Sequence, residues 1–195
     1  MSKNLKKAIT ISIIVVIIII AIISNYFIVK HFQNKAKIDT VKETYTEENI
    51  QDNLDNEDIS VKDDLLLQID GESVVGVIKI DALDFEGLVY EGTSLSTLDK
   101  GVGHFENSSY FDGNVCLAAH NSSKFWAKLY TLHDGDKITY TSFLGTREYY
   151  VNSVEQISET DWSKLENTDE NILTLITCVR KKPALRLCVQ ALEVD

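Results

Sequence analysis

Cysteine is scarce in this chain: 195 residues contain three, at positions 116, 178 and 188. So few cysteines exclude the dense disulfide framework of many small exported domains, and the fold must depend on an apolar core instead. An odd number also leaves at least one thiol without a disulfide partner, whatever the other two do. The sequence therefore contains a candidate reactive thiol.

Positive charge is also in short supply. The chain has 19 Lys and Arg against 30 Asp and Glu, a formal net charge of −11. Nucleic-acid partners are disfavoured, because phosphate binding needs a positive footprint. No paired C-x-x-C knuckle is present, which leaves a zinc site built from Cys116, His120, Cys178 and Cys188 as a minor alternative. We expect no cofactor.

Residues 8–29 form the one long apolar run and contain no charged side chain. A helix of this length crosses the core of a bilayer. The end of the run contains Ser24-Asn25-Tyr26-Phe27, which does not resemble a small-residue cleavage site, so an uncleaved signal anchor is predicted. Residues 1–7 are then cytoplasmic and the rest extracytoplasmic, although lysines flank both ends of the span and weaken the charge signal.

The segment after the apolar run is acidic. Residues 39–64 contain ten carboxylates against Lys42 and Lys62, and they show no sustained apolar periodicity. Such a segment buries too little surface to offset the entropy of ordering it. We therefore predict a flexible stalk over residues 30–68 and a folded domain over 69–195.

The folded domain is predicted to be all-β. Short apolar runs with β-branched residues alternate with turn signals, and no internal repeat or long amphipathic helix is visible. The expected strands are Ser73–Ile80, Phe85–Tyr90, Gly101–Phe105, Asn114–Ala119, Lys137–Ser142, Arg147–Ile157, Asn171–Thr177 and Leu185–Val194. Short helices are expected within residues 93–98, 123–132 and 158–165. Eight short strands with few helices indicate a barrel or a sandwich.

Three reactive side chains stand at the edges of expected strands. Cys178 ends the run Leu173–Thr177, His120 ends the run Asn114–Ala119, and Arg186 opens the last apolar run. A nearby cation favours the thiolate form of a cysteine, which is its nucleophilic form. The combination indicates cysteine-based acyl transfer.

Spacing and order argue against other cysteine enzymes. A phosphatase loop needs an arginine six residues after its cysteine, where this chain has Ala184. Papain-like proteases place the cysteine before the histidine, the reverse of the order here, and the caspase signature is absent.

The same residues carry a family resemblance. Thr174-Leu175-Ile176-Thr177-Cys178 resembles the TLxTC strand of sortases, Leu117-Ala118-Ala119-His120-Asn121 resembles their histidine segment, and Arg186-Leu187-Cys188-Val189 resembles their arginine strand. The order of the motifs and the N-terminal anchor with its stalk also agree. The resemblance covers roughly residues 73–194 and is strongest to class D sortases of Gram-positive bacteria.

The resemblance implies a closed eight-stranded barrel and a transpeptidase reaction. Cys178 would attack the threonine carbonyl of an LPxTG-like sorting signal, His120 would move protons, and Arg186 would bind the substrate or the oxyanion. Thr177 and Ala119 would contribute to substrate binding. The implied partners are sorting-signal-bearing surface proteins and an amine of the cell-wall precursor or of a pilin.

Several other residues have more than one interpretation from the sequence alone. Arg180 competes with Arg186 for the arginine role, although Arg180 lies in a basic loop. His104 is interpreted as structural, and Cys188 as a packing residue. Calcium binding is conceivable from the acidic loop residues Asp112, Glu159 and Asp161, but scattered acidic residues are usually just solvated. The alternative functions are a membrane-tethered β-domain that binds peptides or cell-wall material without catalysis, and a hydrolase that cuts such signals without transfer.

Overall fold

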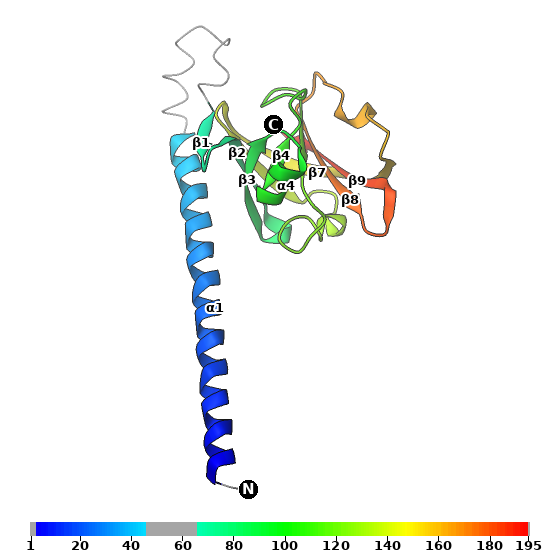
Figure 1. Ribbon diagram of the computed structural model, residues 1–195. Helices are drawn as coiled ribbons and strands as arrows, with labels where there is room; N and C mark the ends of the chain where they lie inside the picture. Colours follow the sequence, from blue (N-terminus) through cyan, green and yellow to red (C-terminus); the bar gives the residue numbers. More distant parts are fainter. Residues whose placement is uncertain (1–2, 46–65, 195) are drawn as a thin grey trace. The chain divides into compact units, whose positions relative to one another are not determined.

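The computed structural model describes residues 3–45 and 66–194 (Figure 1). The chain divides between Asp39 and Thr40 into two compact units, a helical unit and a mainly β unit, and each is described by itself.

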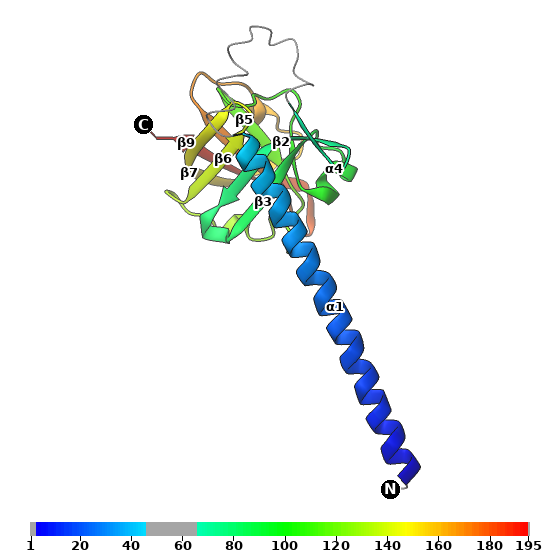
Figure 2. The ribbon, with the colours of Figure 1, turned by 90° about the vertical axis from the view of Figure 1, so that its left-hand side faces the viewer.

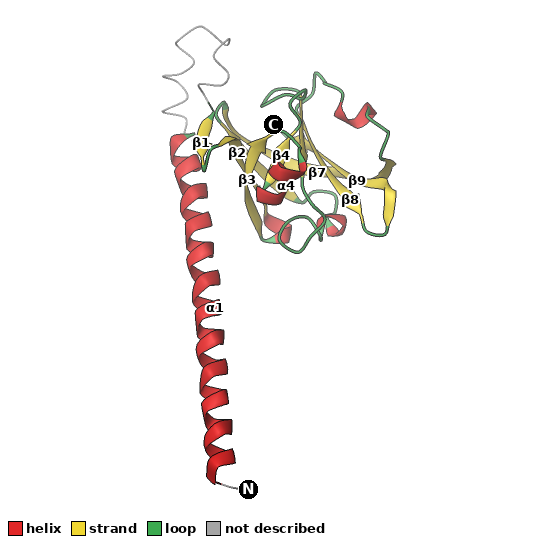
Figure 3. Ribbon diagram, in the orientation of Figure 1, coloured by secondary structure: helices red, strands yellow, loops and turns green. Residues whose placement is uncertain are grey.

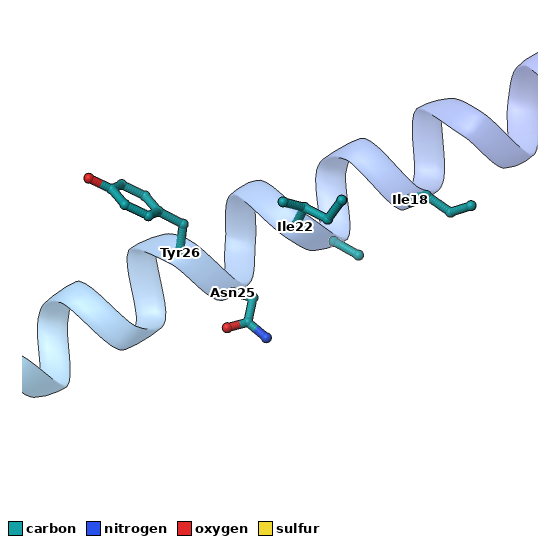
Figure 4. Close-up of a pocket in the computed structure, with 5 residues that line it drawn as sticks. Ile18, Ile22, Asn25 and Tyr26 are labelled. Carbon is teal, nitrogen blue, oxygen red and sulfur yellow. The ribbon is translucent and has the colours of Figure 1, made fainter.

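The first unit is built from helix α1, which spans Lys3–Thr44. The part that begins at Ile9 is long and apolar enough to cross a membrane, judged by length and composition. The isoleucines from Ile9 to Ile28 are exposed on every side, as suits a lipid-facing helix. A shallow pocket on this helix is lined by Ile18, Ala21, Ile22, Asn25 and Tyr26, and it contains no ionisable group other than the tyrosine (Figure 4).

The helix continues beyond the expected span of residues 8–29 and through the first part of the expected stalk. Its last turn belongs to the second unit, where Val41 is completely buried and Tyr45, the next residue after the helix, is 5% exposed. The Tyr45 hydroxyl donates to the Val74 carbonyl at 2.9 Å and accepts from the Leu67 amide at 3.0 Å. These contacts give residues 41–45 a fixed place on the folded domain. Residues 46–65 of the expected stalk lie outside the described residues. Its last residues, 66–68, belong to the folded domain, where Leu66 is 5% exposed.

The second unit is a closed barrel, as predicted (Figures 1, 2 and 3). Within the described residues its strands are β1 (Leu67–Ile69), β2 (Glu72–Ile80), β3 (Phe85–Glu91), β4 (Val102–His104), β5 (Asn114–Ala118), β6 (Lys137–Ser142), β7 (Gly145–Ser158), β8 (Ile172–Val179) and β9 (Lys182–Glu193). The sheet runs in the order β1-β2-β3-β4-β5-β8-β9-β7-β6, and β6 pairs back onto β2. Eight strands, β2 to β9, therefore form the closed barrel. Strand β1, which was not predicted from the sequence, pairs with the first residues of β2 and is not part of the ring.

Within residues 66–194 the second unit also contains four short helices, and all of them except η1 overlap an expected region. They are η1 (Asp81–Leu83), α4 (Leu95–Lys100), η2 (Leu129–Thr131) and η3 (Ser163–Leu165). Helix α4 begins after Ser94, whose hydroxyl accepts a hydrogen bond from the Thr97 amide at 3.2 Å. This is the side-chain cap that serine commonly supplies.

The hydrophobic core lies inside the barrel, and alternate side chains of each strand point into it. On β8, Leu173 and Leu175 belong to the buried core, and on β9 Leu187 and Val189 do so. Side chains alternate between the two faces of a strand. The intervening residues of β8 and β9 therefore point to the outer face of the barrel, where the candidate site is found.

Candidate active site

Strand register places the three predicted catalytic residues in one row. Strands β5 and β8 are parallel, with Ala118 opposite Ile176. Two further residues along each chain bring His120 level with Cys178. Strands β8 and β9 are antiparallel, with Cys178 directly opposite Arg186. Residues opposite one another in a ladder share a face of the sheet, so the Cys178 thiol and the Arg186 guanidinium lie on the same outer face. These two residues and His120, which comes two residues after the last pair of the β5–β8 ladder, form the candidate row.

Three hydrogen bonds hold the ends of β5 and β8 together beside this row. The Ala119 amide donates to the Ile176 carbonyl at 3.2 Å, and the Thr177 hydroxyl donates to the Ala119 carbonyl at 2.7 Å. The Asn121 side-chain amide donates to the Cys178 carbonyl at 2.7 Å. The backbones that carry the imidazole and the thiol are thereby tied directly to one another.

These bonds also define where Thr177 and Ala119 lie. Both are buried, at 2% and 4% exposure, and they bind each other across the strands. Their substrate-binding role stays a prediction. The link through Asn121 was missed by the sequence analysis, because a side-chain bond to the cysteine carbonyl follows from register and has no motif of its own.

The three cysteines differ in access to solvent. None forms a disulfide; Cys178 is exposed, whereas Cys116 and Cys188 are buried. Burial raises the pKa of the Cys116 and Cys188 thiols to about 12. The loop before β8 contributes to this burial, since the Cys116 sulfur lies 3.9 Å from the Leu165 carbonyl oxygen. Buried neutral thiols are unreactive, so Cys178 is the accessible nucleophile.

His120 follows the end of β5 and its ring is partly exposed. Its Nε2 atom lies 3.1 Å from Oδ1 of Asp99, a residue of α4 whose side chain is 76% exposed. No sequence motif indicated this partner, which lies 21 residues upstream in another element.

His104, by contrast, is completely buried. Its Nδ1 lies 3.2 Å from Glu91 Oε2, and its Nε2 lies 3.0 Å from the Ser109 carbonyl oxygen. Both ring nitrogens are thus used inside the domain, in agreement with the structural interpretation of this histidine.

Arg186 lies inside β9, four residues after Lys182, the first residue of that strand, and not at the start of a strand as expected. The strands stay paired almost to the turn, which lengthens β9 toward its N-terminus. The Nη1 group donates to the carbonyls of Pro183 and Leu185 at 2.7 and 3.0 Å. Nη2 lies 3.0 Å from Glu159 Oε2.

The competing Arg180 has a different position. With Val179 paired to Lys182, Arg180 and Lys181 are the two residues of the hairpin turn. Lys181 has a φ of 62°, in the left-handed region that such turns use. Arg180 is therefore outside the row that contains Cys178 and Arg186.

The residues considered for metal binding are dispersed. Asp112 pairs with Arg147, Glu159 pairs with Arg186, and Asp161 accepts hydrogen bonds from Ser163. Within residues 3–45 and 66–194, no group of three or more His, Cys, Asp or Glu side chains is arranged to hold a metal ion.

A family model described as a sortase domain matches residues 78–194, more than half of the chain. The chain belongs to the sortase family. Sortase A of Listeria monocytogenes is 30% identical over 130 residues, which cover 65% of this chain and 59% of that protein. Sortase D of Bacillus subtilis is 29% identical over 107 residues, 53% of each. The chain spans little more than half the length of these curated relatives.

Solved sortases share the barrel. A sortase C from Clostridium perfringens is 25% identical with a TM-score of 0.65, covering 82% of this chain and 99% of that one. Sortase A from Corynebacterium diphtheriae, a lid mutant, is 26% identical with a TM-score of 0.59, covering 64% of this chain and 72% of the other. Members named sortase A, C and D all match, and the resemblance to class D within the family stays a prediction.

Proposed function

We propose that this sortase is a membrane-anchored cysteine transpeptidase that cleaves an LPxTG-like sorting signal between threonine and glycine. One observation carries the proposal. The exposed Cys178 thiol lies directly opposite Arg186 in the β8–β9 ladder, and His120 follows the end of the neighbouring strand β5. A nucleophile, a proton-transfer group and an anion-stabilising group on rigid strands are the parts that acyl transfer needs.

The reaction follows from these three groups. The Cys178 thiolate attacks the threonine carbonyl carbon, and Arg186 stabilises the negative charge on the carbonyl oxygen. The bond to glycine breaks as protonated His120 gives its proton to the leaving amine, and a thioester remains on Cys178. An incoming amine then attacks the thioester and gives a proton to His120. The products are a new amide bond and the free thiolate.

The location of the protein completes the proposal. The apolar part of α1 is a candidate membrane span. With this span as a single-pass anchor, the barrel faces the outside of the cell. The acyl donors are then surface proteins that bear sorting signals, and the acceptor is an amine of a cell-wall precursor or of a pilin.

The test uses the full chain in detergent micelles and a fluorogenic peptide with an LPxTG-like signal. We expect cleavage by the unmodified protein and none by Cys178→Ala, because the thioester cannot form. Cys188→Ala is the matched control, because it removes a buried thiol from the neighbouring strand, and it should retain activity. Full cleavage by Cys178→Ala would exclude the mechanism.

Adding an amine acceptor separates transfer from hydrolysis. A ligated product identified by mass spectrometry supports the transpeptidase, whereas cleavage without ligation across amine acceptors supports a hydrolase. Binding of the peptide without any cleavage supports the non-catalytic alternative.

A further inference from the structure

The carboxylate of Asp99, in helix α4, lies against the imidazole of His120. Asp99 Oδ1 is 3.1 Å from His120 Nε2. We propose that Asp99 is a positioning residue: it accepts the Nε2–H hydrogen bond and so reserves Nδ1 for proton transfer at Cys178. The inference rests on the proposed function of His120 and adds a group to that site.

The backbone at His120 is already fixed, which leaves the ring as the mobile part. The His120 carbonyl accepts hydrogen bonds from the Ser122 amide at 2.9 Å and from the Trp126 amide at 3.1 Å. Trp126 is completely buried in the core. The ring itself is 33% exposed, and Asp99 is its hydrogen-bond partner among the described residues. The orientation of the ring therefore depends on this carboxylate.

Asp99 is held in place although its side chain is exposed. Lys124, from the loop after His120, donates to the Asp99 carbonyl at 3.0 Å. Helix α4 also packs closely on β4, because a Cβ at Gly103 would lie 2.9 Å from Leu98 Cδ2 and 2.4 Å from the Gly92 carbonyl oxygen. A small residue at position 103 thus lets α4 approach and bring Asp99 to the histidine.

The chemical consequence concerns the two ring nitrogens. Neutral imidazole has one N–H, and the hydrogen bond made by one nitrogen decides the role of the other. With Nε2–H bound to Asp99, the Nδ1 atom gives the proton to the leaving amine and later accepts one from the incoming amine. An unrestrained, exposed ring would populate both tautomers and several rotamers. A smaller fraction of the protein molecules would then have the His120 ring in the tautomer and orientation that proton transfer needs.

The kinetic test compares Asp99→Ala and Asp99→Asn in the full chain in micelles. We expect kcat to fall by at least about tenfold in Asp99→Ala, a part of the roughly 10²–10⁴-fold that general acid–base catalysis contributes. KM should change little. Asparagine keeps an acceptor oxygen, so Asp99→Asn should fall between the alanine variant and the unmodified protein.

Asp112→Ala provides the matched control. The Asp112 side chain is 84% exposed and lies 3.1 Å from Arg147 Nη2, but it precedes β5, whereas His120 follows the other end of that strand. Both substitutions remove an exposed carboxylate whose ion pair contributes little to stability. The control should keep kcat near that of the unmodified protein.

A second readout needs no substrate. With ¹⁵N-labelled histidine rings, and His120→Gln to assign the signal, we expect neutral His120 to have the proton on Nε2. In Asp99→Ala the signal should report a mixture of tautomers. An unchanged tautomer or an unchanged kcat in Asp99→Ala would overturn the proposal. A tautomer change in a protein that cleaves no sorting signal would instead reject the proposed function and leave the positioning intact.

Discussion

A single side chain in this sortase acquires its chemistry from its position along a strand. Cys116, Cys178 and Cys188 all lie on strands β5, β8 and β9. The loop that precedes β8 covers the outer face at Cys116, whereas Cys178 lies near the open end of β8. Residue type alone therefore does not distinguish the accessible thiol from the two buried ones, whereas location near the end of a strand does.

Alkylation should distinguish the three thiols. Brief treatment of the folded chain with iodoacetamide at neutral pH should modify Cys178 alone, because burial excludes the reagent from the other two and keeps them protonated. Peptide mass spectrometry locates the label. The Cys178→Ala protein should remain unlabelled until it is unfolded in guanidinium, when both buried cysteines react. Equal labelling of Cys116 in the folded protein would contradict this assignment.

The two candidate arginines should respond differently to a change that preserves charge. Arg186→Lys should lower kcat/KM at least about tenfold, because an ammonium cannot reproduce the planar fork that bonds Pro183 and Glu159. Arg180→Lys, in the hairpin turn, should remain near the unmodified value. A larger loss from Arg180→Lys would reassign the role. Both are measured with the fluorogenic peptide.

At the scale of elements, the barrel depends on the seam where β6 returns to β2. Gly76 lies in this seam opposite Ser142, next to an irregularity in the pairing of β2 with β3. A Cβ at Gly76 would lie 2.0 Å from the Thr141 carbonyl oxygen. The close approach of two backbones at this point requires glycine.

Gly76→Ala should therefore destabilise the domain, by about 1–3 kcal/mol or more, because β6 must move away from β2. Gly87→Ala is the matched control on the adjacent strand. Its Cβ would meet only the ring of Phe85, at 2.9 Å, and a side chain can turn aside. Urea unfolding of both variants in detergent measures the difference. Equal losses of unfolding free energy would show that the seam is not tight.

At the scale of the whole molecule, buried acids link stability to pH. Burial raises the pKa of Cys116, Cys188 and Tyr149 to about 12. In the unfolded chain the thiols ionise near their usual 9.0 and the phenol near 10.0. Their contribution to stability is therefore complete below pH 9 and is lost as the pH rises toward 12.

The free energy of unfolding should fall between pH 9 and pH 12, by about 1.4 kcal/mol per pH unit for each group once its unfolded form ionises. Urea titrations at pH 8 and pH 10.5, with a reductant present, measure this loss. The free energy of unfolding of Cys188→Ala should fall less between pH 8 and pH 10.5 than that of the unmodified protein, whatever its value at pH 8. A stability that does not change over this range would contradict the assignment.

The sequence predicted most of the barrel, because its strands are apolar, β-branched and bounded by turn signals. It also grouped His120, Cys178 and Arg186; the β8–β9 ladder pairs Cys178 with Arg186, and the catalytic roles of the three residues stay a prediction. It missed β1, Asn121 as a link and Asp99 as a partner, because each depends on segments brought together only by folding. The helical part of the expected stalk was also missed, since the contacts of Tyr45 with Val74 and Leu67 leave no local pattern.

The candidate site can form only after strands β5 and β8 have paired. Thr177 and Ala119, which join the two strands, are 58 residues apart in the chain. Contacts between distant segments form slowly, because the loop must close before they contribute. A chain threaded unfolded through a membrane carries a thiol far from any imidazole. In the proposed topology, the candidate acyl-transfer site would therefore be assembled only after export, so the nascent chain would not react with sorting signals while it crosses the membrane.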